Sequence, residues 1–222
     1  MKTNYHITKK TKIAEIGSGT GILTKQMIEF GCDTFAVEPN IEMRKIADRK
    51  LNQFNNYNSI AATAENTTLN SNSIVLIIVA QAFHWFNKEQ FMNECHRIQK
   101  KMNIVLVWNT KNPEQPYIKD LEIVNKRYCK DFKGFSGGIC EEEIRYFFNN
   151  KLSIYNFIND CELDYNGFQN AILTASYAPN ENNENYKDYI SEIQNIFIKH
   201  STKNKIKILN NTIAYTNKNY CV

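Results

Sequence analysis

The chain has 222 residues, of which 42% are apolar and 23% are charged, and these are ordinary values for a folded globular protein. They argue against a disordered chain. The formal net charge is +4, but the lysines are spread along the chain, so we expect no nucleic-acid partner. The longest apolar run, residues 74–80, is far too short to cross a bilayer, so we expect no membrane association.

The six cysteines show no pattern of a metal site or of a secreted scaffold. No pair has C-x-x-C spacing, and no histidine stands at zinc-finger spacing. The first residues also lack the apolar core of a signal peptide. We therefore expect a cytoplasmic protein with reduced thiols and no metal ion.

In the first half of the chain, short apolar segments alternate with segments of helical periodicity. Residues 12–16 form a short apolar strand, and residues 22–30 then place Ile22, Leu23 and Met27 on one helix face. The continuous apolar run at 74–80 is typical of a strand buried on both faces. The other elements expected here are strands at 33–37, 57–62 and 104–108 and helices at 41–54 and 90–100.

The second half of the chain is less regular. Residues 152–163 predict an edge strand, and residues 206–215 predict a last strand. Helices are expected at 118–128, 141–148, 167–176 and 186–200. We find no repeat and no linker, so we predict one domain over residues 1–222, with a cofactor-binding core at 12–110 and substrate-side elements at 111–222.

The alternation of strands and helices predicts the fold class. Strands that follow one another through helices form parallel sheets with right-handed crossovers. We therefore predict an α/β protein with a doubly wound, mostly parallel sheet between two helical layers, which is a three-layer sandwich.

A glycine-rich turn ends the first strand and opens the first helix. Gly17, Gly19 and Gly21 lie in a G-x-G-x-G pattern. Glycine lacks a Cβ, so the backbone of this turn can take a positive φ and approach a ligand closely. The dinucleotide fingerprint G-x-G-x-x-G would need its third glycine at Ile22. A tight strand-to-helix turn without any ligand is the alternative interpretation of the glycines alone.

Two acidic residues accompany this turn. Glu15 lies two residues before Gly17, where a carboxylate suits a cationic ligand group and opposes a pyrophosphate. Glu38 ends the next strand, where a carboxylate can accept hydrogen bonds from ribose hydroxyls. Nicotinamide cofactors use the second feature too, so of the two acidic residues only Glu15 separates the two ligand classes.

Several segments resemble the class I S-adenosylmethionine-dependent methyltransferases. Residues 14–23, 36–43 and 62–67 resemble the first three motifs of that family, and residues 80–86 resemble its small-molecule branch, type 11. The resemblance runs from about residue 12 to about residue 216. It implies a seven-stranded sheet of order 3-2-1-4-5-7-6, with strand 7 antiparallel.

The resemblance also implies the activity and the site. The expected reaction is methyl transfer from S-adenosylmethionine to an unidentified small molecule. Glu15 and the glycine turn would hold the methionine portion of the cofactor, Glu38 the ribose, and Met43, Ala64 and Glu65 the adenine. The implied cofactor-binding residues are Glu15, Gly17, Ser18, Gly19, Gly21, Glu38, Pro39, Met43, Ala64, Glu65 and Gln81.

His84 is the candidate general base, because it follows the fourth strand on the ligand side of the sheet. The alternative is a packed histidine that supports Trp85 and Phe86. We expect these two aromatic residues to cap the core rather than to line a substrate pocket.

The start of the chain affects the expected activity. Relatives carry one or two helices before the first strand, whereas about eleven residues precede it here. We therefore expect an N-terminally truncated member with an open groove above Gly17 to Gly21 and no helix from residues 1–11 over it. The alternative functions are a catalytically impaired or non-catalytic remnant and, less favoured by Glu15 and Ile22, an NAD-dependent oxidoreductase.

Overall fold

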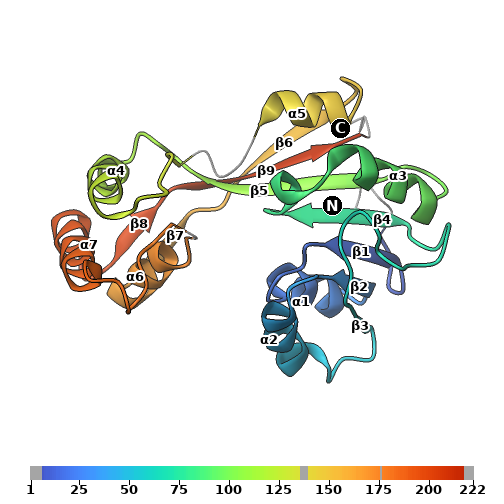
Figure 1. The fold of residues 1–222 in the computed structure, drawn as a ribbon, viewed down its shortest axis with the longest axis horizontal. Helices are drawn as coiled ribbons and strands as arrows, with labels where there is room; N and C mark the ends of the chain where they lie inside the picture. Colours follow the sequence, from blue (N-terminus) through green and yellow to red (C-terminus); the bar gives the residue numbers. More distant parts are fainter. Residues whose placement is uncertain (1–6, 136–139, 176, 218–222) are drawn as a thin grey trace. The chain divides into compact units, whose positions relative to one another are not determined.

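The computed structural model describes residues 7–135, 140–175 and 177–217. Seven strands form one sheet in the order β3-β2-β1-β4-β5-β9-β6 (Figure 1). These strands are β1 (Lys12–Ile16), β2 (Asp33–Val37), β3 (Tyr57–Ile60), β4 (Leu76–Ala80), β5 (Ile104–Lys111), β6 (Ser153–Ile158) and β9 (Asn210–Thr216). The helices are α1 (Ile22–Glu29), α2 (Ile41–Leu51), α3 (Lys88–Ile98), α4 (Pro116–Tyr128), α5 (Glu141–Phe147), α6 (Tyr165–Leu173) and α7 (Tyr186–His200), with a 3-10 helix η1 (Phe83–Trp85).

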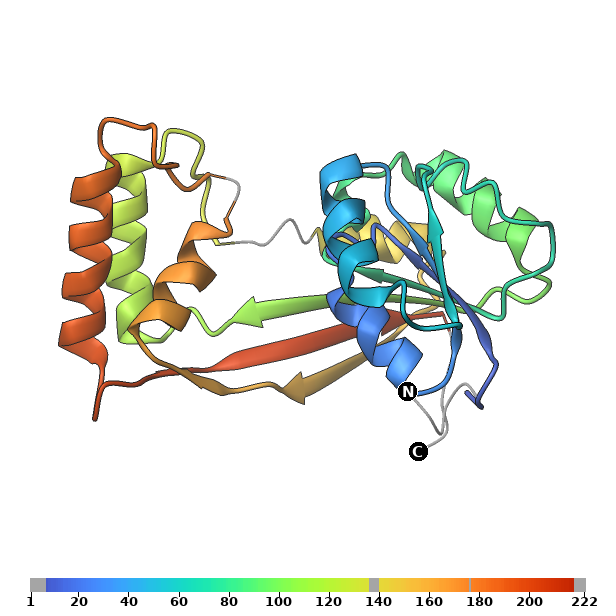
Figure 2. The same ribbon diagram turned by 90° about the horizontal axis from the view of Figure 1, so that it is seen from below.

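The predicted strand order is confirmed. β1 pairs in parallel with β2 and β4, β2 pairs with β3, and β4 pairs with β5. β9 runs against β5 and occupies the place predicted for an antiparallel strand 7 (Figure 2). The last strand is the ninth because two short strands, β7 (Cys161–Leu163) and β8 (Ile206–Ile208), pair antiparallel in a sheet of their own.

Two predicted strands are each divided in the structure. Residues 152–163 form β6 and β7, and residues 206–215 form β8 and most of β9. The interruption at Leu209 has a clear cause, because its backbone pairs with a side chain. Gln115 accepts from Leu209 N at 2.6 Å and donates to Leu209 O at 3.0 Å, so Leu209 N is paired with a side chain, while Leu209 O also accepts from Asn112 N at 3.0 Å.

The chain divides into two compact units. Unit 1 contains residues 1–108, 138–155 and 213–222, and unit 2 contains residues 109–137 and 156–212. The first boundary lies two residues before the predicted division at 110. The prediction of one domain over the whole chain stays a prediction.

The sheet of unit 1 is covered on both faces. Ile77 and Val79 of β4 pack in one cluster with residues of α3 and α5, whereas Leu76 and Ile78 pack in another with residues of α1. This alternation follows from the two-residue period of a strand. All four side chains are fully buried, as the continuous apolar run predicts, and the three layers of the predicted sandwich result.

Unit 2 has a core of its own. α4 and α6 pack against α7 (Figure 2), and their buried residues form one apolar cluster with Ile206 and Ile208 of β8. A buried hydrogen bond from Tyr189 Oη to Asn125 Oδ1, 2.8 Å long, joins α7 to α4. In the described parts of the two units, no helix is long and apolar enough to cross a membrane.

Candidate functional site

The glycine turn after β1 has the backbone that the pattern predicts. Gly17, Gly19 and Gly21 have φ angles of 73°, 56° and 80°, a region that side chains other than glycine rarely adopt. Gly17 N and Ser18 N both donate to Val37 O, at 2.8 and 3.1 Å. The turn is therefore tied to the end of β2, and Gly21 caps α1 without a side-chain hydrogen bond.

The three glycines differ in what surrounds them. A Cβ at Gly17 would stand 2.5 Å from Ala82 Cβ, and a Cβ at Gly21 would stand 2.7 Å from Leu51 Cδ1. A Cβ at Gly19 would meet nothing closer than Met43 Sδ at 3.9 Å. Gly17 and Gly21 therefore allow close packing of the chain on itself, whereas Gly19 has room on the side that a Cβ would occupy, with only the Met43 side chain in contact distance.

The Glu38 carboxylate lies against the centre of this turn. Its Oε2 accepts from Gly19 N and its Oε1 accepts from Asn40 N, both at 2.9 Å. Arg44 NH1 donates to Glu38 O and Pro39 O at 2.7 and 2.8 Å. The acid at the end of β2 is therefore fixed on both sides, and the Asn40 side chain caps α2 by accepting from Glu42 N and Met43 N.

Glu15 lies beneath the turn with only 2% of its surface exposed. Its carboxylate accepts a short hydrogen bond from Thr24 Oγ1 of α1. Burial raises the pKa of Glu15 to about 8; the Thr24 hydrogen bond opposes this rise, and the nearby Glu38 charge adds to it. A buried carboxyl with a raised pKa gains most from a cationic partner.

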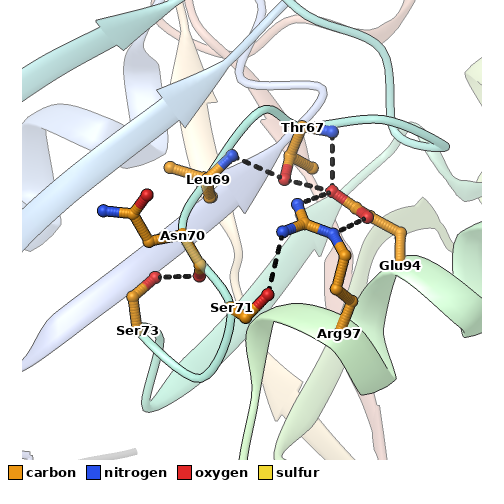
Figure 3. Close-up of polar contacts among 7 residues, drawn as sticks. All are labelled: Thr67, Leu69, Asn70, Ser71, Ser73, Glu94 and Arg97. Carbon is orange, nitrogen blue, oxygen red and sulfur yellow. Dashed lines mark hydrogen bonds and ion pairs between the residues drawn. The ribbon is translucent and has the colours of Figure 1, made fainter.

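The loop between β3 and β4 carries the residues predicted beside the adenine. Its first turn adjoins Glu38, because Glu38 N donates to Ile60 O at 3.0 Å. Ala64 is buried, and Glu65 Oε1 accepts from Asn87 N at 2.9 Å. Figure 3 shows the next part of the loop, where the Glu94 carboxylate of α3 bonds Thr67.

Met43 and Gln81 are exposed, at different places along the carboxyl edge of the parallel strands. Met43 lies in the first turn of α2, next to Gly19. Gln81 directly follows β4, has a positive φ of 58° and donates from its backbone N to Val107 O at 2.9 Å. The structure thus brings Gly19, Glu38 and Met43 together, with Gln81 at the end of the neighbouring strand.

His84 lies in η1 and contacts Trp85 in a tilted arrangement, with 4.9 Å between ring centroids and 45° between ring planes. Burial, and secondly the charge of Lys88, lower its pKa below the ordinary histidine value. Its Nδ1 is buried and has no hydrogen-bond partner among the described residues. The imidazole is therefore neutral at pH 7, and its role as a base stays a prediction.

Two expectations about apolar side chains are wrong. Trp85 is 76% exposed rather than part of the core, because η1 turns it outward while Phe83 and Phe86 pack inward. Ile22 is 74% exposed because it begins α1 at the ligand edge, where only later residues of the helix reach the sheet. Both side chains are therefore available at the carboxyl edge of the sheet.

The described part of the N-terminal segment, residues 7–11, forms no helix. Lys10 N donates to Gly31 O at 2.8 Å, and Asp33 N donates to Thr11 O at 3.0 Å. Gly31 and Asp33 stand at the start of β2, so this segment lies at the amino edge of the sheet, away from the glycine turn. Residues 1–6 lie outside the described chain.

Sequence reasoning missed three supporting residues: Thr24, Arg44 and Glu94. Thr24, in the first turn of α1, donates to the Glu15 carboxylate, and Arg44 donates to the backbone oxygen of Glu38. Neither has a distinctive sequence pattern. Glu94 and Arg97 have the i, i+3 spacing of a helix ion pair, which could have been noticed, but Thr67 as their partner could not.

A groove of about 770 Å³ in unit 2 contains none of the predicted site residues. It is lined by Tyr117 and by the lysines at 203, 205 and 207. Glu162 and Asp160 lie 3.8 and 3.5 Å from two of these lysines, so much of the positive charge is balanced within unit 2.

Comparisons with known proteins identify related domains. Residues 14–107 match the model of a methyltransferase domain. An uncharacterized methyltransferase-like protein of Schizosaccharomyces pombe is 33% identical over 133 residues, which cover 59% of this chain and 51% of that protein. An uncharacterized methyltransferase of Mycobacterium tuberculosis is 32% identical over 117 residues, covering 52% and 47%. The chain thus spans about half the length of these curated relatives.

Solved structures share the fold. A proposed type II methyltransferase of Anaeromyxobacter dehalogenans has a TM-score of 0.66 at 18% identity, with 93% of this chain and 87% of that one covered. The YcgJ protein of Bacillus subtilis has a TM-score of 0.59 at 16% identity, with 98% and 95% covered. Together these comparisons show that residues 14–107 match a methyltransferase domain and that the chain has the fold of the two solved structures.

Proposed function

We propose that this chain binds S-adenosylmethionine at the carboxyl edge of β1 and β2 and transfers its methyl group to a small molecule. The observation that carries the proposal is the open space above Gly19, next to a buried and oriented Glu38 carboxylate. A glycine turn between a strand and a helix is a frequent place for ligands in open α/β sheets.

The residues present fit this cofactor. Glu38 keeps lone pairs that can accept from ribose hydroxyls in addition to the two backbone bonds. Glu15 offers a buried carboxyl for the ammonium group of the methionine portion. A phosphate placed beside Glu15 would gain no counter-charge, because this carboxyl is either neutral or anionic, and this disfavours an NAD-dependent oxidoreductase.

The cofactor supplies an activated methyl group on a sulfonium leaving group. The protein then has to hold the acceptor in line with that methyl, and orientation of this kind contributes about 7–11 kcal/mol to the lowering of the barrier. His84, half-buried and neutral at pH 7, is proposed to take the proton of an acceptor that must lose one.

A second candidate is cofactor binding with little or no turnover. The observation that favours it is the exposure of Ile22 and Trp85 at the ligand edge. Apolar side chains around a closed active site are normally covered, and such cover excludes water from the reaction. A site left this open would bind the cofactor weakly and orient an acceptor poorly.

Isothermal titration tests the binding step directly. The purified chain is titrated with S-adenosylmethionine, with its demethylated product S-adenosylhomocysteine, and with NAD. We expect binding of the first two at a stoichiometry near one and none of NAD. Binding of NAD alone would contradict the assignment. Cofactor binding without conversion to S-adenosylhomocysteine across a panel of small acceptors would favour the second candidate.

A further inference from the structure

The loop between β3 and β4 is held by α3 rather than by its own backbone alone. Asn72 N donates to Arg97 O at 2.9 Å, and Ile74 N donates to Ile98 O at 3.0 Å. At the other end of the helix, Glu65 accepts from Asn87 N. The start and the end of this loop are therefore both attached to one helix.

The strongest of these attachments is the Glu94 carboxylate (Figure 3). Its Oε1 accepts from Thr67 N at 2.7 Å and from Thr67 Oγ1 at 2.5 Å. Arg97 donates to both carboxylate oxygens, from Nε and NH2, at 2.7 Å each. The same guanidinium reaches Ser71 Oγ at 3.4 Å, so one ion pair contacts two positions of the loop.

Glu94 is charged in spite of its burial, with 6% of its surface exposed. Burial alone would raise its pKa, but the hydrogen bonds from Arg97 and Thr67 outweigh burial and lower the pKa below the ordinary glutamate value. Hydrogen bonds to a charged group are stronger than neutral ones. The carboxylate is therefore a firm anchor for Thr67, which is itself fully buried.

Thr67 lies close in sequence to the predicted adenine wall. Ala64 and Glu65 precede it by three and two residues, and Thr63 forms a bridge with Asn66, which closes this short segment into one turn. The turn's other anchor, Ile60 O, bonds Glu38 N. The position of the segment relative to Glu38 is consequently fixed at both ends.

We propose that Glu94 is a positioning residue that, through Thr67, holds the turn at Ala64 and Glu65 in the place where it contacts the adenine. This inference rests on the proposed function. Without Glu94 the turn samples several positions, and the apparent cofactor affinity falls by the fraction of molecules in the competent one. Glu94 itself touches no part of the cofactor.

Titration of two variants with S-adenosylhomocysteine and with adenosine alone tests the proposal. Glu94→Gln keeps the shape of the side chain but removes the charge that holds Thr67 and Arg97. Glu89→Gln is the matched control, because Glu89 is exposed in the first turn of the same helix. We expect Glu94→Gln to raise both dissociation constants about fivefold or more at unchanged stoichiometry, and Glu89→Gln to leave them within twofold.

A second pair of variants distinguishes loss of the hydrogen bond from loss of folding. Thr67→Val removes the hydroxyl bond to Glu94, whereas Thr67→Ser retains it. We expect Thr67→Val to weaken adenosine binding and Thr67→Ser to bind as the parent does. Hydrogen exchange at the Thr67 amide should also be faster in Glu94→Gln than in the parent.

The outcomes separate this inference from the proposed function. Dissociation constants of Glu94→Gln within twofold of the parent would overturn the positioning role and leave the proposed function standing. A fall in stoichiometry at an unchanged dissociation constant would make Glu94 a purely structural residue and overturn the role as well. If the parent chain binds neither S-adenosylhomocysteine nor adenosine, the proposed function is wrong and the inference fails with it.

Discussion

Glu38 Oε2 accepts a hydrogen bond from Gly19 N at 2.9 Å, so the acid at the end of β2 fixes the centre of the glycine turn after β1. The two residues are 19 positions apart in sequence and come together because β1 and β2 are adjacent and parallel. The carboxylate therefore orders the turn, and its remaining lone pairs are the acceptors that we propose for the ribose hydroxyls.

Substitution of Glu38 should weaken cofactor binding strongly. Glu38→Ala removes an acceptor for ribose and frees Gly19 N, so we expect a loss on the order of 1.5–3 kcal/mol, which is about tenfold or more in dissociation constant. Titration with S-adenosylhomocysteine measures it. Glu42→Gln, an exposed acid on α2, is the control, and an affinity of Glu38→Ala within twofold of the parent would place the ribose elsewhere.

The three glycines of the turn should respond differently to substitution. Gly19→Ala has room for its Cβ, so only the positive φ opposes it, at about 1–2 kcal/mol. Gly19→Val should retain the fold but abolish detectable cofactor binding, because its branched side chain fills the space proposed for the ligand.

Gly17→Ala and Gly21→Ala should instead lower the stability of the protein. Their Cβ atoms would stand under 3.0 Å from Ala82 and Leu51, and such overpacking costs about 1–3 kcal/mol. Thermal unfolding and cofactor titration of the three alanine variants separate the two effects. Equal losses of stability at all three positions would contradict the assignment of Gly19 to ligand contact.

Glu15→Gln should stabilise the cofactor-free protein at neutral pH. The folded protein holds the Glu15 proton more tightly than the unfolded chain does, since burial raises the pKa from the ordinary glutamate value of 4.5 to about 8. The contribution of Glu15 to the free energy of unfolding is therefore lost as pH rises through that range. Replacing Glu15 with glutamine should raise the free energy of unfolding by roughly 2–4 kcal/mol at pH 7. Urea unfolding from pH 5 to pH 8 measures the slope.

The same substitution should weaken cofactor binding, because the ammonium group loses its anionic partner. In the parent, binding at pH 7 should release a proton, which titration in buffers of different ionisation enthalpy detects. Glu29→Gln, an exposed change in α1, should alter neither property. A parent chain whose stability does not fall over that pH range would show that Glu15 is not protonated.

His84 should titrate below the ordinary histidine range. Burial is the larger cause and the Lys88 charge the smaller, so Lys88→Gln should raise the pKa of His84 only in part. NMR titration of the imidazole protons, with His84→Asn used to assign the signal, measures both values. Full restoration of the ordinary pKa by Lys88→Gln would show that charge rather than burial controls this residue.

Local periodicity in the sequence was sufficient to predict much of the fold. The apolar run at 74–80 predicted a strand covered on both faces, and Leu76 to Val79 are fully buried. The glycine spacing predicted a turn with positive φ, and all three glycines adopt it. The family resemblance added the strand order, including the antiparallel strand beside the edge.

Which side chains meet depends instead on tertiary packing. The bond between Glu94 and Thr67 joins residues 27 positions apart. Gln115 bonds Leu209, which lies 94 positions later in the sequence, at the point where the predicted strand is divided. The exposure of Trp85 and Ile22 likewise depends on where η1 and α1 begin relative to the sheet. Periodicity records which residues share a face of one element, but hydrogen bonds and burial between elements depend on packing distances that no local pattern contains.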